Sequence, residues 1–119
     1  MSEKKRMMHL GISEGEIGGY VLLPSSPERA ELLSHYLEDC TQVAYFREYK
    51  TFTGKLDGVT VSITSTGMGG PSMAIAVEEL HECGAHTLIR VGTCESTSEK
   101  VHVGDLVLPN FSVRFYVLG

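Results

Sequence analysis

The sequence predicts a single α/β domain with a mixed sheet, on two observations. First, residues 59–66 alternate apolar and polar side chains and lead through a glycine turn into a helical pattern and a second apolar run at 87–91. Two strands joined by a helix in this way are expected to lie parallel. Second, Asp57-Gly58 is a strong β-hairpin signal, which predicts an antiparallel strand before this unit.

The residues before this unit predict an irregular arm followed by short elements. Residues 1–19 show weak periodicity, with a turn at 13–16 that resembles a capping box. Ala30, Leu33 and Leu37 share one side of a helical pattern, which indicates a helix packed on the sheet. The expected elements are a strand at 20–23, a helix at 27–37 capped by Ser26, and strands at 41–46 and 49–56.

The helix of the strand-helix-strand unit is predicted over 72–83. Pro71 suits its first position and Gly84 the position after its end. The side chains expected to face the sheet are Met73, Ala76, Val77 and Leu80, and those expected to face away are Glu78, Glu79 and Glu82. After the second strand, residues 94–102 predict a polar loop and 111–118 a final β-like run that would leave an unpaired sheet edge.

Composition narrows the class of protein. A chain of 119 residues fits one domain, and its net charge of −5 argues against a nucleic-acid partner, because phosphate backbones are held by clustered Lys and Arg. No apolar run is long enough for a signal peptide or a membrane span. Three widely spaced cysteines fit free thiols in a reducing compartment better than a disulfide framework, so we expect a cytoplasmic protein.

Three arginines, Arg29, Arg47 and Arg90, stand at predicted strand ends or in the turns just beyond them. Ligands of open α/β sheets bind beyond the carboxyl ends of the strands, and the guanidinium fork matches a phosphate oxyanion. We therefore expect these arginines to converge on a small dianion, with Thr93 and the glycine turn beside them. The alternative is three separate surface arginines, each solvated or ion-paired.

Other motifs predict less. The glycine turn lacks the third glycine and the acidic residue of a dinucleotide fingerprint, and the chain has no P-loop. His81 and Cys83 fall on opposite sides of one helix, so together with His86 they do not predict a metal site. Cys94 follows a strand end, but no histidine is obviously paired with it as a base.

Several longer pieces occur in one order along nearly the whole chain: His9-Leu10-Gly11, Pro27-Glu28-Arg29, Arg47-Glu48, Thr66-Gly67-Met68-Gly69-Gly70-Pro71-Ser72, Arg90-Val91-Gly92-Thr93 and Val103-Gly104-Asp105. At these residues the sequence resembles the nucleoside phosphorylase family, and most closely its bacterial uridine phosphorylases. The resemblance implies a three-layer phosphorylase-like α/β fold, a mixed sheet with flanking helices, in truncated form. The implied reaction is phosphorolysis of uridine or a related nucleoside to the free base and ribose 1-phosphate.

The resemblance also implies roles for individual residues. Orthophosphate, the co-substrate, would be bound by Arg29, Arg47, Arg90, Thr93, Ser25 and Gly69. His9 would reach the ribose from a neighbouring subunit, and Glu48, Met68 and Ser72 would hold a potassium ion between subunits. No other cofactor is implied. The implied assembly is a dimer-based homo-oligomer, which is a hexamer in the family.

Two features predict an incomplete catalytic site. Ser25-Ser26 and Cys94-Glu95 replace glycine-containing pairs of the family, and the chain stops before the family's base-recognising residues. We therefore expect residues 1–119 to form a single, incomplete phosphorylase-like domain. Four functions stay open at this point: a uridine phosphorylase, a purine nucleoside phosphorylase, a nucleosidase, and a non-catalytic module that retains a phosphate-binding corner.

Overall fold

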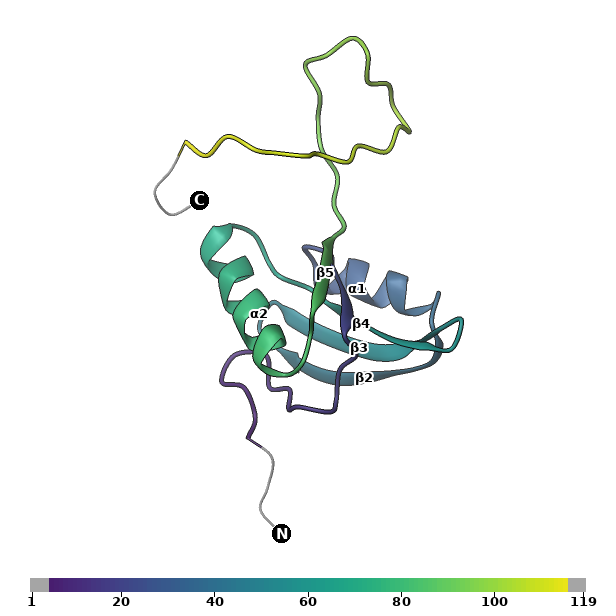
Figure 1. Ribbon diagram of the computed structural model, residues 1–119, viewed down its shortest axis with the longest axis vertical. Helices are drawn as coiled ribbons and strands as arrows, with labels where there is room; N and C mark the ends of the chain where they lie inside the picture. The colour runs from purple at the N-terminus through teal and green to yellow at the C-terminus, as the bar shows by residue number, and fades with distance from the viewer. Residues whose placement is uncertain (1–4, 116–119) are drawn as a thin grey trace.

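The computed structural model describes residues 5–115 and shows one twisted sheet with a helix on each face (Figure 1). In these residues the sheet has five strands in the order β2-β3-β4-β1-β5. The elements along the chain are β1 (Tyr20–Leu23), α1 (Pro27–Ser34), β2 (Glu38–Phe46), β3 (Tyr49–Leu56), β4 (Val59–Thr64), α2 (Gly70–Glu82) and β5 (Thr87–Arg90). The predicted α/β class with a mixed sheet is therefore confirmed.

The pairing of the strands brings three carboxyl ends to one rim of the sheet. β1 lies between β4 and β5 and pairs in parallel with both, while β3 pairs antiparallel with β2 and β4. The two strands of the predicted strand-helix-strand unit are thus parallel but separated by β1. The turns that leave β4, β1 and β5 all start from the same edge, where α/β folds bind ligands.

Two apolar clusters, one on each face of the sheet, form the core. Beneath α1, Ala30 packs with Phe52 and Ile63. On the other face, Ala76 and Leu80 of α2 pack against Val21 and Leu23 of β1. Leu22, between them in β1, packs against the α1 cluster instead, because side chains alternate across a strand. These two helices and the sheet make up the predicted three layers.

The ends of both helices follow from local hydrogen bonding. The Ser26 hydroxyl accepts a hydrogen bond from the Arg29 amide at 3.2 Å, which confirms the predicted cap of α1. α1 stops at Ser34 rather than continuing to Leu37, because the amides of residues 35–37 bond three residues back and tighten into a turn. α2 ends at Glu82 with Cys83 as its C-cap, and Gly84 follows with a φ of +107° that suits glycine, while the Ala85 amide bonds back to Leu80.

The N-terminal arm belongs to the core, which its weak periodicity did not predict. Leu10 and Ile12 are fully buried in the cluster under α2. The Arg6 guanidinium donates to the Gly11 carbonyl at 2.7 Å and pairs with Glu16. Glu16 also accepts from the Ser13 amide at 2.7 Å, which is half of the predicted capping box, although no helix follows it.

The segment after β5 differs from the prediction. Residues 91–115 contain no strand and extend away from the sheet (Figure 1). The β-like run expected at 111–118 is not a strand in its described part, and residues 116–118 lie outside the described residues. A β-pattern becomes a strand only when another strand accepts its backbone hydrogen bonds, and none lies beside 111–115. Val103, Leu106 and Leu108 are consequently exposed.

Removing the side chain of Leu80 should test the core on the α2 face. Leu80 is fully buried, so we expect Leu80→Ala to lower the free energy of unfolding by about 2–5 kcal/mol, measured by urea denaturation. Leu32→Ala is the matched control, because Leu32 on α1 is 65% exposed and its loss should cost well under about 1 kcal/mol. Equal effects of the two substitutions would contradict the packing described here.

Candidate anion-binding site

The turn between β4 and α2 is built from glycines that the geometry requires. Gly67 has a φ of +71°, and a Cβ there would stand 2.6 Å from Cγ of Glu48 and 2.8 Å from Oγ of Ser72. Neither the backbone angle nor the space suits a side chain. The Gly67 amide donates to the Ser25 carbonyl at 2.9 Å, which ties this turn to the loop leaving β1.

The N-terminus of α2 faces this turn without a side-chain cap. Its N-cap residue is Gly69, which offers no side-chain hydrogen bond, and no acidic residue occupies the first turn. The first amides of a helix lack partners within the helix and carry a partial positive charge. A helix end of this kind is a favourable place for an anion.

Arg90 brings a full positive charge to the same rim. It is the last residue of β5, and its Nη1 donates to the carbonyls of Leu23 at 3.0 Å and of Val91 at 2.6 Å. The guanidinium folds over Gly92, where a Cβ would stand 3.0 Å from Nη1. These bonds use one of the two terminal nitrogens, so the guanidinium retains further donors for a ligand.

Arg90 and the glycine turn meet in one hollow. Its volume is about 380 Å³, and it is lined by Ser25, Gly67, Met68, Gly69, Gly70, Met73 and Arg90. Its charge comes from a guanidinium and the helix end, and no carboxylate lines it. We name this hollow the anion corner. It brings together three of the residues predicted to bind phosphate: Arg90, Ser25 and Gly69.

The other predicted phosphate residues lie elsewhere. Arg29 is exposed on the first turn of α1 and Thr93 is exposed beyond β5, and neither lines the anion corner. Arg47 lines a separate hollow of about 390 Å³ together with His9 and Glu48. Arg47 and Arg90 thus line different hollows of this chain, because the β2–β3 hairpin carries Arg47 toward the arm.

Arg47 occupies the tip of that hairpin in a strained backbone conformation. Its φ of +52° is uncommon for a residue with a side chain, and the hairpin passes from Phe46 to Tyr49 through only two residues. We name the hollow lined by Arg47, His9 and Glu48 the arm hollow. Strain of this kind is kept where the surrounding structure holds the residue in place, and functional sites often contain it.

Glu48 lines the arm hollow and lies close to Gly67, which lines the anion corner. The Ser72 hydroxyl donates to Glu48 Oε2 at 2.7 Å, and the Tyr49 hydroxyl donates to the Ser72 carbonyl at 2.9 Å. The hydrogen bond from Ser72, followed by one from the Glu48 backbone, lowers the pKa of the Glu48 carboxyl. Glu48 and Ser72 thus hold two oxygen atoms close together at the first turn of α2.

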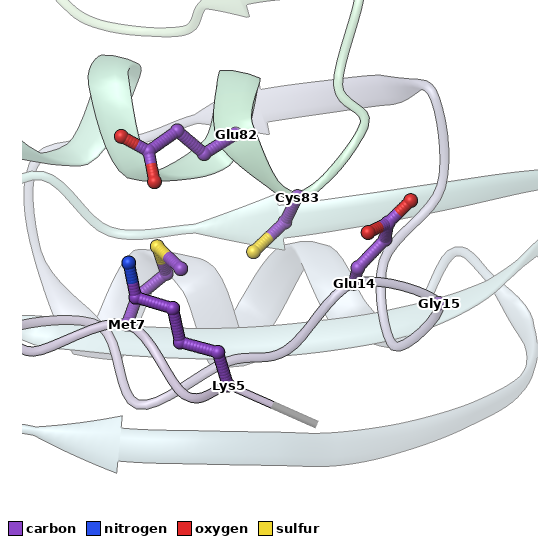
Figure 2. A pocket seen from close by; sticks show the side chains of 6 residues that line it. All are labelled: Lys5, Met7, Glu14, Gly15, Glu82 and Cys83. Carbon is purple, nitrogen blue, oxygen red and sulfur yellow. The ribbon is translucent and has the colours of Figure 1, made fainter. Parts of the chain in front are cut away.

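A third hollow, of about 570 Å³, lies where the arm passes the C-terminal end of α2 (Figure 2). It is lined by Lys5, Met7, Glu14, Gly15, Glu82 and Cys83, none of which was a predicted site residue. Burial, reinforced by the nearby Glu82 carboxylate, raises the pKa of the Cys83 thiol. This hollow therefore holds a thiol and no activated cysteine nucleophile.

In residues 5–115, no three His, Cys, Asp or Glu side chains gather as they would around a metal ion. None of the helices in that range is both long and apolar enough to span a bilayer.

One contact at the arm hollow had no sequence signal. The helical pattern places Glu79 on the outer face of α2, yet only 14% of its side chain is exposed, because the arm covers it. Its carboxylate lies 2.6 Å from Nδ1 of His9. Only the path of the arm reveals this pair, since the two residues are far apart in the sequence.

Comparison with known proteins agrees with these features. The sequence pattern of the phosphorylase superfamily matches residues 20–117. Uridine phosphorylase from Thermococcus kodakarensis is 43% identical over 113 residues, which cover 95% of this chain and 41% of that protein. A DeoD-type purine nucleoside phosphorylase from Lactococcus lactis is 44% identical over 102 residues, covering 84% of this chain and 44% of the relative.

A solved structure gives the same answer for the fold. The crystal structure of uridine phosphorylase from Vibrio fischeri superposes with a TM-score of 0.81 at 36% identity, covering 84% of this chain and 42% of that one. The chain thus spans less than half the length of the relatives that it matches. The relatives differ in their nucleoside, so the comparisons leave the base open.

Two alanine substitutions test whether the turn between β4 and α2 requires glycine at position 67. Gly67→Ala should cost more stability than Gly58→Ala, because both residues have positive φ but a side chain meets close neighbours only at Gly67. A positive φ alone costs about 1–2 kcal/mol. We expect Gly58→Ala to lose that amount and Gly67→Ala clearly more, measured by urea denaturation. Equal losses would show that the Gly67 site has room for a methyl group.

The hydrogen bond from Ser72 can be tested by titration. Ser72→Ala should raise the pKa of Glu48 toward its ordinary value, measured by carbon NMR of the Glu48 carboxyl group. A carboxyl with a lowered folded-state pKa stabilises the fold above its unfolded pKa, and this stabilisation fades as the pH falls through the folded value. Ser72→Ala should therefore cost more stability above the ordinary pKa of a glutamate than below the lowered pKa of Glu48, where the carboxyl is protonated. Ser98→Ala, in the exposed segment, is the control.

Proposed function

Because the chain belongs to the phosphorylase superfamily, we propose that it supplies the phosphate-binding half of a nucleoside phosphorylase. The single observation that carries this proposal is the anion corner, where Arg90, the glycine turn and the uncapped end of α2 surround one hollow. The proposed ligand there is orthophosphate, and the proposed substrate is uridine or a related nucleoside.

In the proposed reaction, an oxygen of the bound phosphate attacks C1′ of the nucleoside while the glycosidic bond breaks. The electrons of that bond leave with the base, which gains a proton, and the sugar becomes ribose 1-phosphate. The sugar is cation-like in the transition state, so a fixed dianion both attacks it and stabilises it. The anion corner would contribute by holding the phosphate next to C1′, so that the attack proceeds within one complex rather than by a chance encounter of two molecules.

Arg29 and Thr93 complete the proposed phosphate site from its two sides. Arg29 lies on the first turn of α1, which follows β1, and Thr93 lies on the segment that follows β5. Both are exposed and are therefore able to move onto a ligand. Arg47 and His9 share the arm hollow instead, so we propose that they serve the site of a neighbouring copy. A complete site then needs at least two copies of the chain, in line with the expected homo-oligomer.

A potassium ion fits the pair formed by Glu48 and Ser72. Both groups offer oxygen atoms, which suit hard cations, and their 2.7 Å contact already brings two of the three predicted ligands together. The third would be the carbonyl of Met68. We propose that a bound potassium ion would balance the charge of Glu48 and hold neighbouring subunits together.

Phosphate affinity tests the anion corner directly. We expect Arg90→Ala to weaken phosphate binding by about 10- to 100-fold, measured by isothermal titration calorimetry, because a hydrogen bond to a charged group contributes about 1.5–3 kcal/mol. Phosphate affinity of Arg90→Lys should lie between those of the parent chain and Arg90→Ala, since lysine keeps the charge but lacks the paired N–H donors of the guanidinium. Lys55→Ala is the control. It removes a positive charge at the end of β3 that lies away from the rim of the anion corner, and it should change phosphate affinity little. Unchanged binding in Arg90→Ala would place the anion elsewhere.

Turnover separates the candidate functions. Release of uracil or a purine base from its nucleoside that requires phosphate would support a phosphorylase and identify its base. Release that proceeds equally without phosphate would favour a nucleosidase, which the arginine at the anion corner argues against. Phosphate binding without turnover of any nucleoside, even at high protein concentration, would assign this chain the role of a non-catalytic phosphate-binding module.

A further inference from the structure

Glu79 on α2 is largely covered, although a carboxylate on the outer face of a helix is normally solvated. Its two oxygens instead accept hydrogen bonds from three N–H groups of the arm. Oε1 accepts from the amides of His9 at 3.1 Å and Leu10 at 2.9 Å, and Oε2 lies 2.6 Å from Nδ1 of His9. One side chain thus fixes both the backbone of the arm and the imidazole ring.

The contact with Nδ1 determines which ring nitrogen carries the proton. A carboxylate can only accept, so Nδ1 must donate and therefore bears the hydrogen. In a neutral imidazole the other nitrogen, Nε2, then has a free lone pair. Among the described residues Nε2 has no hydrogen-bond partner, and His9 is 43% exposed where it lines the arm hollow beside Arg47.

We propose that Glu79 is a positioning residue that holds His9 in the Nδ1–H tautomer, so that Nε2 is presented as a hydrogen-bond acceptor. This inference rests on the proposed function, in which His9 meets the ribose of a nucleoside bound to a neighbouring copy. An acceptor at that point recognises a free 5′-hydroxyl, which can donate. A 5′-phosphate would gain no hydrogen bond from this nitrogen, because its oxygens mainly accept hydrogen bonds.

The tautomer is measurable in the chain itself, without any ligand. Long-range proton–nitrogen NMR correlations distinguish Nδ1–H from Nε2–H imidazole, and His9→Gln identifies the His9 signals among those of the five histidines. The spectra are recorded at a pH high enough that the nitrogen shifts of His9 no longer change with pH. We expect the parent chain to show His9 predominantly as the Nδ1–H tautomer.

Glu79→Gln should shift His9 toward the Nε2–H tautomer, because the glutamine amide can donate to Nδ1 where the carboxylate could only accept. Glu78→Gln is the matched control: it removes the same charge from the preceding residue of α2, which is exposed, and should leave the tautomer unchanged. A parent chain with mainly Nε2–H His9 would overturn the proposal, as would a folded Glu79→Gln variant with an unchanged tautomer. If Glu79→Gln does not fold, the tautomer of the parent still decides.

The two proposals fail separately. A chain that shows the Nδ1–H tautomer but binds no phosphate would contradict the proposed function and leave the role of Glu79 intact. A chain that binds phosphate through Arg90 but holds His9 in the other tautomer would contradict only the positioning role.

Discussion

The close approach of chain segments at Gly67 is the constraint on which the rest of this structure depends. A side chain there would collide with Glu48 and Ser72, so only glycine lets the start of α2 come down against the β2–β3 hairpin. That approach aims the free amides of α2 at the rim where β4, β1 and β5 end. It also brings Ser25 alongside, through the hydrogen bond between the Gly67 amide and the Ser25 carbonyl.

Positive and negative groups lie on different sides of the start of α2. On one side Arg90 and the helix end create a positive hollow without a carboxylate. On the other, Glu48 is held by Ser72 and lies beside Arg47. Because the Glu48 carboxylate is bound by a hydroxyl and turned toward the arm, it does not neutralise the anion corner. One helix terminus can therefore sit between an anion site and a candidate cation site.

The arm links the core to the second hollow. Leu10 and Ile12 are buried under α2, and this burial places the neighbouring His9 against Glu79 at the edge of the arm hollow. The apolar packing of Leu10 thus positions the polar side chain of His9, the residue just before it. The arm also covers Ser62 of β4, which is fully buried and whose hydroxyl accepts a hydrogen bond from the Gly18 amide at 2.9 Å.

Local sequence determined the elements of this protein, and only the tertiary structure decided which side chains meet. Period-two and helical patterns, the Asp57-Gly58 hairpin and the Ser26 cap act over a few residues, so the strands, both helices and the glycine turn could be predicted. The path of the arm, the separation of Arg47 from Arg90, the pair of His9 with Glu79 and the unpaired state of 111–115 could not. Each depends on contacts between residues distant in the chain, whose geometry is set by how apolar faces pack and which strands find partners.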